Sequence, residues 1–248
     1  MSNSKMAQFN NGVKNGLPIG LGYLSVSFAF GAQASILGIP WFMSVFISMT
    51  NLTSAGQLAG ITIIATFGTI LEMILTQLVI NARYFLMSIT LSQKMDNSFS
   101  LKHRFLCAAF VTDEIFAVAS SRPKTFSKPF FFGLVILPYF GWALGTLLGG
   151  IAADLMPSQV TNALGLALYA MFIAIIIPPS TKSKGVFVAV AIATATSCAL
   201  YFIPVLNSLS EGMRYIISAL LSASITAFIF PVKIESEQDE SKTNAEVN

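Results

Sequence analysis

Three acidic residues lie inside strongly apolar sequence, and their side chains are the ones most able to do chemistry in this chain. Glu72 lies in an apolar stretch over 58–91, and Asp113 and Glu114 lie at the centre of a second stretch over 105–120. An ionisable group at membrane depth costs about 3 kcal/mol or more, so it is usually tolerated only where it faces a protein interior or a water-filled cavity. The three acids are therefore candidates for lining a permeation path.

Asp113 and Glu114 are adjacent, so their side chains would point about 100° apart on a helix. At least one of them is expected to face a cavity, where a carboxyl group that exchanges a proton would suit proton-coupled transport. The alternative is a pair of acids neutralised by an Arg or Lys side chain from another segment. Because ionisable residues inside a membrane are so often functional, we favour the cavity.

Polar side chains also follow two lines along the expected span over 64–91. Glu72, Thr76 and Arg83 share one face, because eleven residues at about 100° each return to within about 20° of the starting direction. A second line on another face contains Gln77, Asn81 and Ser88. A span with two polar faces is expected at the centre of a helix bundle rather than in lipid. For Arg83, an anchor at the cytoplasmic membrane surface is the alternative to a substrate role.

The composition indicates the solvent in which the chain folds. Hydrophobic residues make up 54% of the 248 residues, charged residues make up 10%, and the mean hydropathy is +0.73. A soluble domain has about 25% charged residues, so this chain has too few to cover a surface that faces water. We predict an all-α membrane protein, a polytopic helical bundle in one membrane domain. Cys107 and Cys198 both lie in apolar runs and provide neither a disulfide framework nor metal-ligand spacing.

About six apolar runs are long enough to cross a bilayer as helices, since a helical span needs about 20 residues. The expected spans are 16–37, 64–91, 130–152, 160–177, 186–203 and 214–232. Together they form a transmembrane transporter domain over 16–233. We expect a cytoplasmic N-terminal segment over 1–15 and an acidic, disordered cytoplasmic tail over 234–248.

Two further segments are expected to be broken or re-entrant. The run over 40–63 is interrupted by polar and small residues over 50–57, which predicts two half-helices around a break. The run over 105–121 is short for a span, and Lys and Arg residues lie both before and after it. If both flanks are cytoplasmic, as the positive-inside rule favours, this run enters and leaves on one side, and the first run is then a hairpin from outside. Ordinary seventh or eighth spans are the alternative.

The break over 50–57 is a candidate transport site. Non-helical backbone at membrane depth is tolerated only where it lines a cavity or is buried in protein, and many transporters hold their substrates at broken helices. Ser54, Gly56 and Gln57 are the candidate residues in the break. The alternative is a plain turn between two helices.

Glycines repeat every four residues in the expected span over 130–152. Gly141, Gly145 and Gly149 lie close to one helix face, where bare backbone lets a neighbouring helix approach. The first span has a looser series of small residues, namely Gly16, Gly20, Ser27, Gly31 and Ser35. We interpret both series as packing seams rather than substrate contacts, because small-residue faces are common in helix bundles.

Four stretches resemble, in chain order, the signature sequences of the AzlC family. They are Gly-Leu-Pro-Ile-Gly-Leu-Gly-Tyr over 16–23 followed by Phe-Ala-Phe-Gly over 28–31, Ser-Ala-Gly-Gln over 54–57, Asn-Ala-Arg-Tyr over 81–84, and Thr-Asp-Glu-Ile-Phe-Ala over 112–117. Proteins of this family are the large permease subunits of bacterial branched-chain amino acid exporters. Two positions depart from the family's pattern, since Tyr84 stands where a histidine is usual and the run over 164–167 lacks the usual aspartate of the fifth passage.

The resemblance implies a transporter that exports valine, leucine, isoleucine or methionine across the bacterial cytoplasmic membrane, without a cofactor or a metal. It also implies a small four-span membrane partner of the AzlD type. Taken with the polar pattern, it gives the residues expected to bind substrate or couple its transport: Ser54, Gly56, Gln57, Glu72, Asn81, Arg83, Asp113 and Glu114. The lipid bilayer is the other expected partner, nucleic acid is not, and both chain termini are expected in the cytoplasm.

Other functional classes have weaker support in the sequence. A channel or a membrane assembly subunit is the main alternative to a carrier. An intramembrane hydrolase would need a histidine at membrane depth, a metal motif or two facing aspartates. However, His103 lies in a basic loop, no H-E-x-x-H occurs, and Asp113 has only the distant Asp154 or Glu72 as a partner. A primary pump would need the phosphate-binding G-x-x-x-x-G-K-[ST] pattern, which the chain lacks. We therefore expect a secondary transporter rather than an enzyme.

Overall fold

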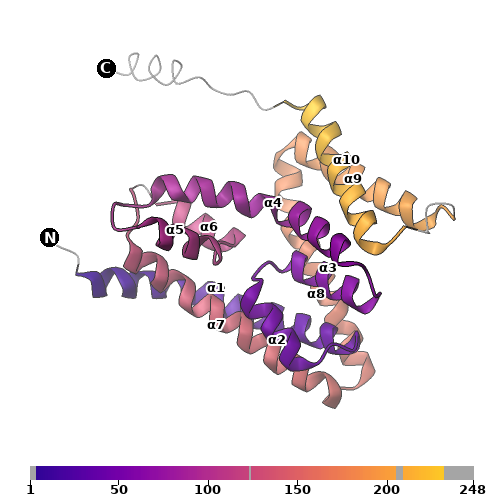
Figure 1. Ribbon diagram of the computed structural model, residues 1–248, viewed down its shortest axis with the longest axis horizontal. Helices are drawn as coiled ribbons and strands as arrows, with labels where there is room; N and C mark the ends of the chain where they lie inside the picture. Colours follow the sequence, from indigo (N-terminus) through magenta and orange to yellow (C-terminus); the bar gives the residue numbers. More distant parts are fainter. Residues whose placement is uncertain (1–3, 123, 205–208, 232–248) are drawn as a thin grey trace.

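The computed structural model describes residues 4–122, 124–204 and 209–231, and the regular elements in this part of the chain are helices (Figure 1). In chain order they are α1 (Lys5–Ile36), α2 (Trp41–Thr50), α3 (Ala55–Ala65), α4 (Ile70–Lys94), α5 (Leu101–Ala108), α6 (Asp113–Ser120), α7 (Lys128–Ala152), the 3-10 helix η1 (Ala153–Leu155), α8 (Ser158–Lys182), α9 (Lys184–Phe202) and α10 (Glu211–Ile229). Within the described residues, α1, α4, α7, α9 and α10 are long and apolar enough to cross a membrane. The α8 helix has 25 residues, as α4 and α7 do. The prediction of an all-α membrane protein is confirmed.

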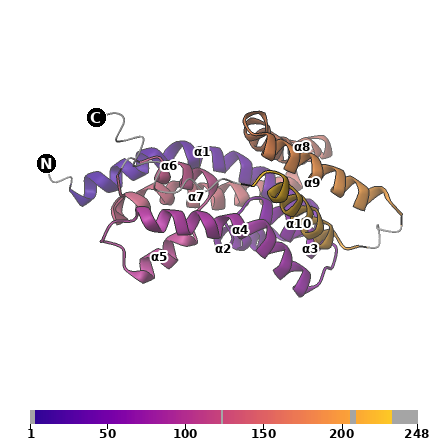
Figure 2. The same ribbon diagram turned by 90° about the horizontal axis from the view of Figure 1, so that it is seen from above.

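The closest helix contact joins α1 to α7, which lie side by side along the molecule (Figures 1 and 2). Glycines make this approach possible. A methyl group added at Gly145 would collide with Ser27 Oγ and with the backbone of Leu24, and one added at Gly149 would collide with the backbone of Phe28. The predicted packing seam is therefore present, and it brings the two backbones into direct contact.

The α1 and α7 helices run in the same direction. Gly12, near the start of α1, contacts the backbone near the start of α7 at Phe130, and Gly31, near the end of α1, contacts α7 at Thr146. Two parallel spans need an odd number of membrane crossings between them. A single crossing by α4, the long helix between them in the chain, satisfies this requirement if the α2–α3 and α5–α6 segments each turn back to the side from which they enter.

The α5–α6 segment is a hairpin whose two flanks lie together. The backbone N–H of Phe126 donates to the carbonyl of Lys94 (3.0 Å), and the N–H of Asp96 donates to the carbonyl of Phe126 (3.1 Å). Lys94 Nζ also donates to the carbonyl of Ser120 at the end of α6 (2.5 Å). The chain therefore enters and leaves at the same end of the bundle. We call this the inner hairpin (residues 101–120).

The α2–α3 segment forms a second hairpin at the opposite end. Ile61, near the end of α3, packs in one cluster with Ile39, which precedes α2, and with Ala34 near the end of α1. The half-helices are separated by a break in which Ser54 has φ +52°, a left-handed backbone conformation that is uncommon for a residue with a side chain. We call this the outer hairpin (residues 41–65), and it matches the two half-helices predicted over 40–63.

The first helix is longer than predicted. The expected polar segment over 1–15 becomes helical after Ser4, whose Oγ accepts a hydrogen bond from the backbone N–H of Ala7 (3.2 Å). One face of this extension is buried against α7, because Gly12 continues the glycine contact. The polar side chains of this segment predict that the first span begins after it, whereas its packing face, which consists of small residues, continues the span as a helix.

The span predicted over 64–91 is interrupted near its start. Phe67 has φ +55°, so α3 ends before it and a new helix, α4, follows. Thr69 caps α4, with its side chain accepting a hydrogen bond from the backbone N–H of Glu72 (3.1 Å). The tail predicted over 234–248 lies outside the described residues.

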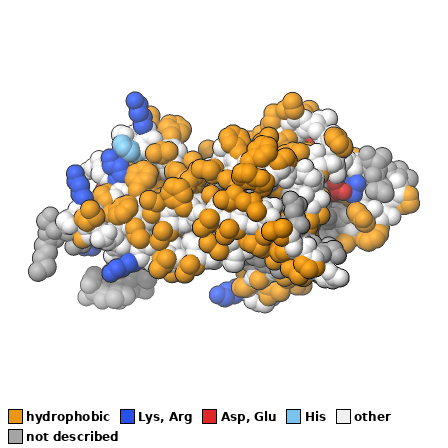
Figure 3. All heavy atoms as spheres, turned by 90° about the horizontal axis from the view of Figure 1, so that it is seen from below, with side chains coloured by type: hydrophobic (Ala, Val, Ile, Leu, Met, Phe, Trp, Pro, Cys, Tyr) orange, Lys and Arg blue, Asp and Glu red, His pale blue; other side chains and the backbone are white. Residues whose placement is uncertain are grey.

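The surface has the character of a membrane protein. Apolar side chains cover the face seen in Figure 3, and most of the Lys and Arg side chains on that face lie toward one end. The basic residues in the first turn of the inner hairpin or on its flanks are Lys94, Lys102, Arg104, Arg122, Lys124 and Lys128. By the positive-inside rule, this is the expected cytoplasmic end.

Cysteines introduced at Ser98 and Thr125 should both react with a membrane-impermeant maleimide from the cytoplasmic side only. Both positions are exposed and flank the inner hairpin. The background would carry Cys107→Ala and Cys198→Ser, and labelling would be compared in vesicles of the two orientations. Phe67→Cys, at a position that is 94% exposed at the other end, is the control and should react from outside. Labelling of the first two from opposite sides would make the inner hairpin a span.

Gly145→Ala should lower the stability of the bundle by about 1–3 kcal/mol, because the added methyl group overpacks the seam against Ser27 and Leu24. Gly22→Ala on α1 is the matched control, since a methyl group there meets no atom within 4 Å. Thermal unfolding of both purified variants in detergent measures the difference. Equal midpoints for the two variants would contradict the role given to the seam.

Candidate functional site

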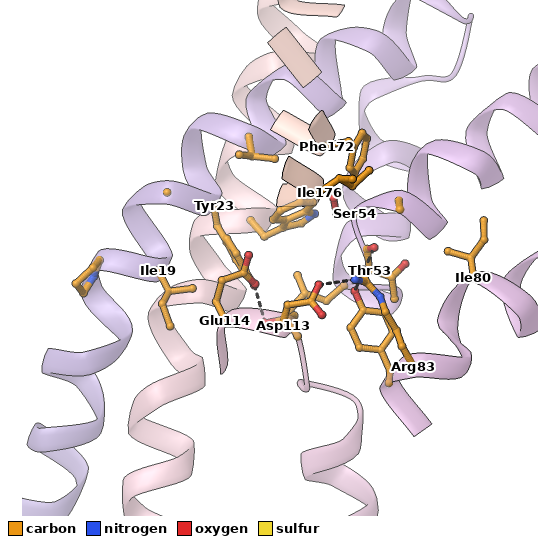
Figure 4. Close-up of a pocket in the computed structure, with 18 residues that line it drawn as sticks. Ile19, Tyr23, Thr53, Ser54, Ile80, Arg83, Asp113, Glu114, Phe172 and Ile176 are labelled. Carbon is orange, nitrogen blue, oxygen red and sulfur yellow. Dashed lines mark hydrogen bonds and ion pairs between the residues drawn. The ribbon is translucent and has the colours of Figure 1, made fainter. Parts of the chain in front are cut away.

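A cavity of about 500 Å³ lies where the breaks of the two hairpins meet the middle of the long helices (Figure 4). Its wall is formed by Pro18, Ile19, Gly22, Tyr23, Val26, Leu52, Thr53, Ser54, Ala55, Ile80, Arg83, Tyr84, Thr112, Asp113, Glu114, Trp142, Phe172 and Ile176. These residues come from α1, α4, α7 and α8, from the starts of α3 and α6, and from the break of the outer hairpin. A cavity at the middle of the spans, bordered by broken helices, is the usual arrangement of a transporter's binding site.

The start of α6 provides the negative charge of the cavity. Thr112 caps the helix, and Asp113 and Glu114 occupy its first turn, where the positive end of the helix dipole favours acidic side chains. Arg83 Nη1 on α4 lies 2.8 Å from Asp113 Oδ2 (Figure 4). The side chains of this ion pair are 41% and 35% exposed, so the pair faces the open space of the cavity.

Glu114 is held by α1. The hydroxyl group of Tyr23 donates to Glu114 Oε2 at 2.5 Å and lies 2.6 Å from Thr112 Oγ1. A tyrosine hydroxyl has one hydrogen, so the Thr112 hydroxyl is the donor to Tyr23 while Tyr23 donates to the carboxylate. This chain of hydrogen bonds fixes Glu114 on the side of the cavity away from Arg83.

Tyr84 joins the ion pair to the outer hairpin. Arg83 Nη2 donates to the hydroxyl group of Tyr84 at 3.0 Å, and that hydroxyl group donates to the carbonyl of Thr53 at 3.4 Å. The position at which the sequence departs from the AzlC pattern therefore lies in the cavity wall. The two hairpin breaks are connected here through α4, from Thr53 to Asp113.

The remaining wall of the cavity is apolar. It is formed mainly by Pro18, Ile19, Val26, Leu52, Ile80, Phe172 and Ile176. The cavity thus combines charges of both signs, those of Arg83, Asp113 and Glu114, with an apolar surface. This arrangement suits a small ligand that carries opposite charges at one end and an apolar group at the other.

Four of the eight residues predicted for the site line the cavity, namely Ser54, Arg83, Asp113 and Glu114. Gln57 lies behind it and is fully buried. Its Nε2 donates to Ser48 Oγ (2.9 Å), and its Oε1 accepts from the backbone N–H of Ser54 (3.2 Å). Gln57 therefore ties the two half-helices of the outer hairpin together.

Gly56 and Asn81 also support the outer hairpin from behind. Gln77 Nε2 donates to the carbonyl of Gly56 (2.8 Å), and Asn81 Nδ2 donates to Gln77 Oε1 (2.9 Å). A methyl group added at Gly56 would come within 2.9 Å of both Gln77 Oε1 and Asn81 Oδ1. The second polar line of α4 therefore supplies hydrogen bonds to the backbone at the break of the hairpin. Gly56 and Asn81 do not line the cavity.

Glu72 does not line the cavity, so its place on a permeation path stays a prediction. Its side chain is buried, and Oε1 accepts a hydrogen bond from the backbone N–H of Gly212 (2.7 Å) at the start of α10. A carboxylate at a helix N-terminus is stabilised by the helix dipole and by the free N–H groups there. Glu72 thus attaches α10 to α4.

Four polar residues of the cavity wall were not among the predicted site residues, namely Tyr23, Thr53, Tyr84 and Thr112. Tyr23 and Thr112 lie in the stretches that resemble the AzlC signatures, but their residue types alone did not indicate that they form a hydrogen-bond chain to Glu114. Trp142, on α7, also lines the cavity, and no sequence pattern singled it out. His103, which the sequence places in a basic loop, bonds to Ser100 and Lys128 outside the cavity. Among the described residues, no group of three His, Cys, Asp or Glu side chains could hold a metal.

Comparisons with known proteins agree with the resemblance. A family model described as AzlC protein matches residues 18–156. An uncharacterized membrane protein of Archaeoglobus fulgidus is 30% identical over 190 residues, covering 76% of this chain and 83% of the relative. The inner membrane protein YgaZ of Escherichia coli K12 is 27% identical over 230 residues, covering 90% and 92% of the two chains. An uncharacterized membrane protein of Helicobacter pylori 26695 is 25% identical over 198 residues, covering 76% and 86%. No solved structure matches the chain.

Glu72→Gln should lower the stability of the bundle by about 1–2 kcal/mol, because the charge that caps α10 is lost. Asp96→Asn is the control, since this acid also accepts a backbone hydrogen bond, from Ser98 (2.9 Å), but in an exposed turn. Thermal unfolding in detergent would measure both variants. A midpoint for the Glu72 variant at or above that of the control would contradict a structural role for Glu72.

Proposed function

The chain belongs to the AzlC family, and on that premise we propose that it is a permease subunit that exports branched-chain or similarly apolar amino acids. The family and the membrane-protein relatives indicate a transport-related role rather than an enzymatic one. The more specific statement about substrate and direction is the proposal.

The chemistry of the cavity is the observation that carries this proposal. An apolar amino acid presents an ammonium group, a carboxylate and a hydrocarbon side chain within a few bonds. The carboxylates of Asp113 and Glu114 suit the ammonium group, and Arg83 or the N-terminus of α3 suits the carboxylate. The apolar wall suits the side chain, and a volume of about 500 Å³ is in the range of small-molecule sites.

The arrangement of the hairpins supports a secondary transporter. The inner hairpin reaches the cavity from one side of the membrane, and the outer hairpin reaches it from the other. Each hairpin is therefore placed to separate the bound substrate from one aqueous phase while the α1–α7 pair stays fixed. Asp113 and Glu114 are also the groups that could exchange a proton if export is coupled to proton entry.

We propose that the transporter lies in the bacterial cytoplasmic membrane with both termini in the cytoplasm, because the basic residues gather at the end where α1 begins. We further propose that a small AzlD-type membrane subunit accompanies it. This partner follows from the family alone. Much of the apolar surface of α4, α9 and α10 is exposed in the isolated chain and leaves room for lipid or for a second subunit.

Asp113→Asn and Glu114→Gln should each abolish export of leucine from preloaded proteoliposomes while the protein remains in the membrane at near-normal abundance. Each change removes a charge from the cavity and keeps the shape of the side chain. Asp96→Asn is the matched control, because it changes an acid outside the cavity, and it should transport as the unmodified protein does. Flux of radiolabelled leucine, with and without the small partner, is the measurement.

The same assay separates a carrier from the alternatives. Saturable flux that discriminates leucine from a polar amino acid supports the carrier. Unsaturable flux would indicate a channel, and absence of flux under both conditions would indicate an assembly subunit. Normal export by both cavity variants would remove Asp113 and Glu114 from the transport site.

A further inference from the structure

Trp142 has a polar group that the rest of the protein leaves unused. Its side chain is 3% exposed and lines the cavity, and its indole N–H has no hydrogen-bond partner among the described residues. Buried tryptophan N–H groups usually find a partner, because an unsatisfied donor is costly away from water. The other buried side-chain atoms without a partner in the described chain belong to residues outside the cavity wall; they are Thr76 Oγ1, Asn81 Oδ1, Ser218 Oγ and Thr226 Oγ1.

The position of Trp142 is fixed by its neighbours. Its ring packs edge-to-face on Tyr23, with ring centroids 5.0 Å apart and an interplanar angle of 82°. Both rings form a buried cluster with Leu52, which lies in the break of the outer hairpin. The indole is therefore held beside the break that precedes α3, and it is rigid before any ligand arrives.

The α3 helix offers an unpaired donor at the same place. Ala55, its first residue, lines the cavity, and its backbone N–H has no partner among the described residues, whereas the N–H of Gly56 donates to the carbonyl of Thr53 (3.4 Å). The side chain of Ser54 points into the same space (Figure 4). The first turn of α3 contains no acidic residue, whereas the first turn of α6 contains two. The positive end of α3 therefore remains open to an anionic group of a ligand.

We propose that the indole N–H of Trp142, together with the N-terminus of α3, binds the carboxylate of the transported amino acid. This inference rests on the proposed function and defines the orientation of the substrate. The ammonium group then lies toward Glu114 and Asp113 at the start of α6. Arg83, already paired with Asp113, positions that acid instead of receiving the substrate's carboxylate.

Leucine binding to the purified full-length protein in detergent tests the inference. Trp142→Phe removes the N–H group and keeps an aromatic ring, so the dissociation constant for leucine should rise about 10-fold or more, as expected for loss of a hydrogen bond to a charged group. Trp41→Phe is the matched control. Trp41 lies at the start of α2, 47% exposed and away from the cavity, and its variant should bind leucine as the unmodified protein does.

A second ligand separates a hydrogen bond from ring packing. 3-Methylbutylamine is leucine without its carboxylate, so Trp142→Phe should change its affinity by less than about 2-fold. Unchanged leucine affinity in the Trp142 variant would overturn the inference and leave the proposed function standing. An equal loss for leucine and for the amine would also overturn it, because the ring and not the N–H group would then be responsible. Failure of the unmodified protein to bind any apolar amino acid would overturn the proposed function and this inference with it.

Fluorescence provides a measurement that needs no change at Trp142. The chain has two tryptophans, so the Trp41→Phe variant reports on Trp142 alone. Saturating leucine should shift or quench its emission, and 3-methylbutylamine should have a smaller effect, because only leucine brings a carboxylate to the indole. An emission spectrum that leucine leaves unchanged would contradict the proposed contact.

Discussion

Direct backbone contact between α1 and α7 is the constraint on which the rest of the structure depends. Glycines on both helices allow this contact along most of their length, from Gly12 of α1, which meets Phe130, to Gly149 of α7, which meets Phe28. Because the pair is parallel, the chain between them crosses the membrane an odd number of times, and one crossing through α4 satisfies this. The remaining two segments are hairpins whose flanks lie together, and their breaks meet beside the parallel pair. The cavity thus lies beside this pair, which contributes Tyr23 and Trp142 to its wall.

Broken helices inside a membrane expose backbone groups that water cannot reach, and side chains of α4 and the hairpins satisfy some of them here. The side chain of Gln77 donates a hydrogen bond to the carbonyl of Gly56, and that of Tyr84 donates to the carbonyl of Thr53. The side chain of Gln57 accepts a hydrogen bond from the backbone N–H of Ser54. These contacts let the outer hairpin hold its break at a fixed place. The polar residues of α4 therefore divide into those that support the break and those that face the ligand space.

The sequence predicted more of the fold than of the site. Charge on both flanks of the inner hairpin and polar residues in the outer one were sufficient to predict that both segments are broken, since these patterns follow directly from the cost of polar groups in lipid. Glu72 shows the limit, because helical periodicity placed it on the face of Arg83 but could not reveal that α10 begins beside it. Trp142 shows the converse. An apolar residue in an apolar span carries no signal until its neighbours are known.

The origin of the cavity wall bears on how relatives of this protein can diverge. The polar and charged side chains of the cavity, from Tyr23 to Trp142, fall within the region that matches the family model, whereas Phe172 and Ile176 of α8 lie beyond its end at residue 156. Most of the apolar wall, from Pro18 to Ile80, also lies inside that region, so α8 supplies the part of the wall that the family match does not cover. Under the proposed function, a substitution at Phe172 or Ile176 would change the fit of the substrate's apolar side chain and leave the charged groups of the cavity in place.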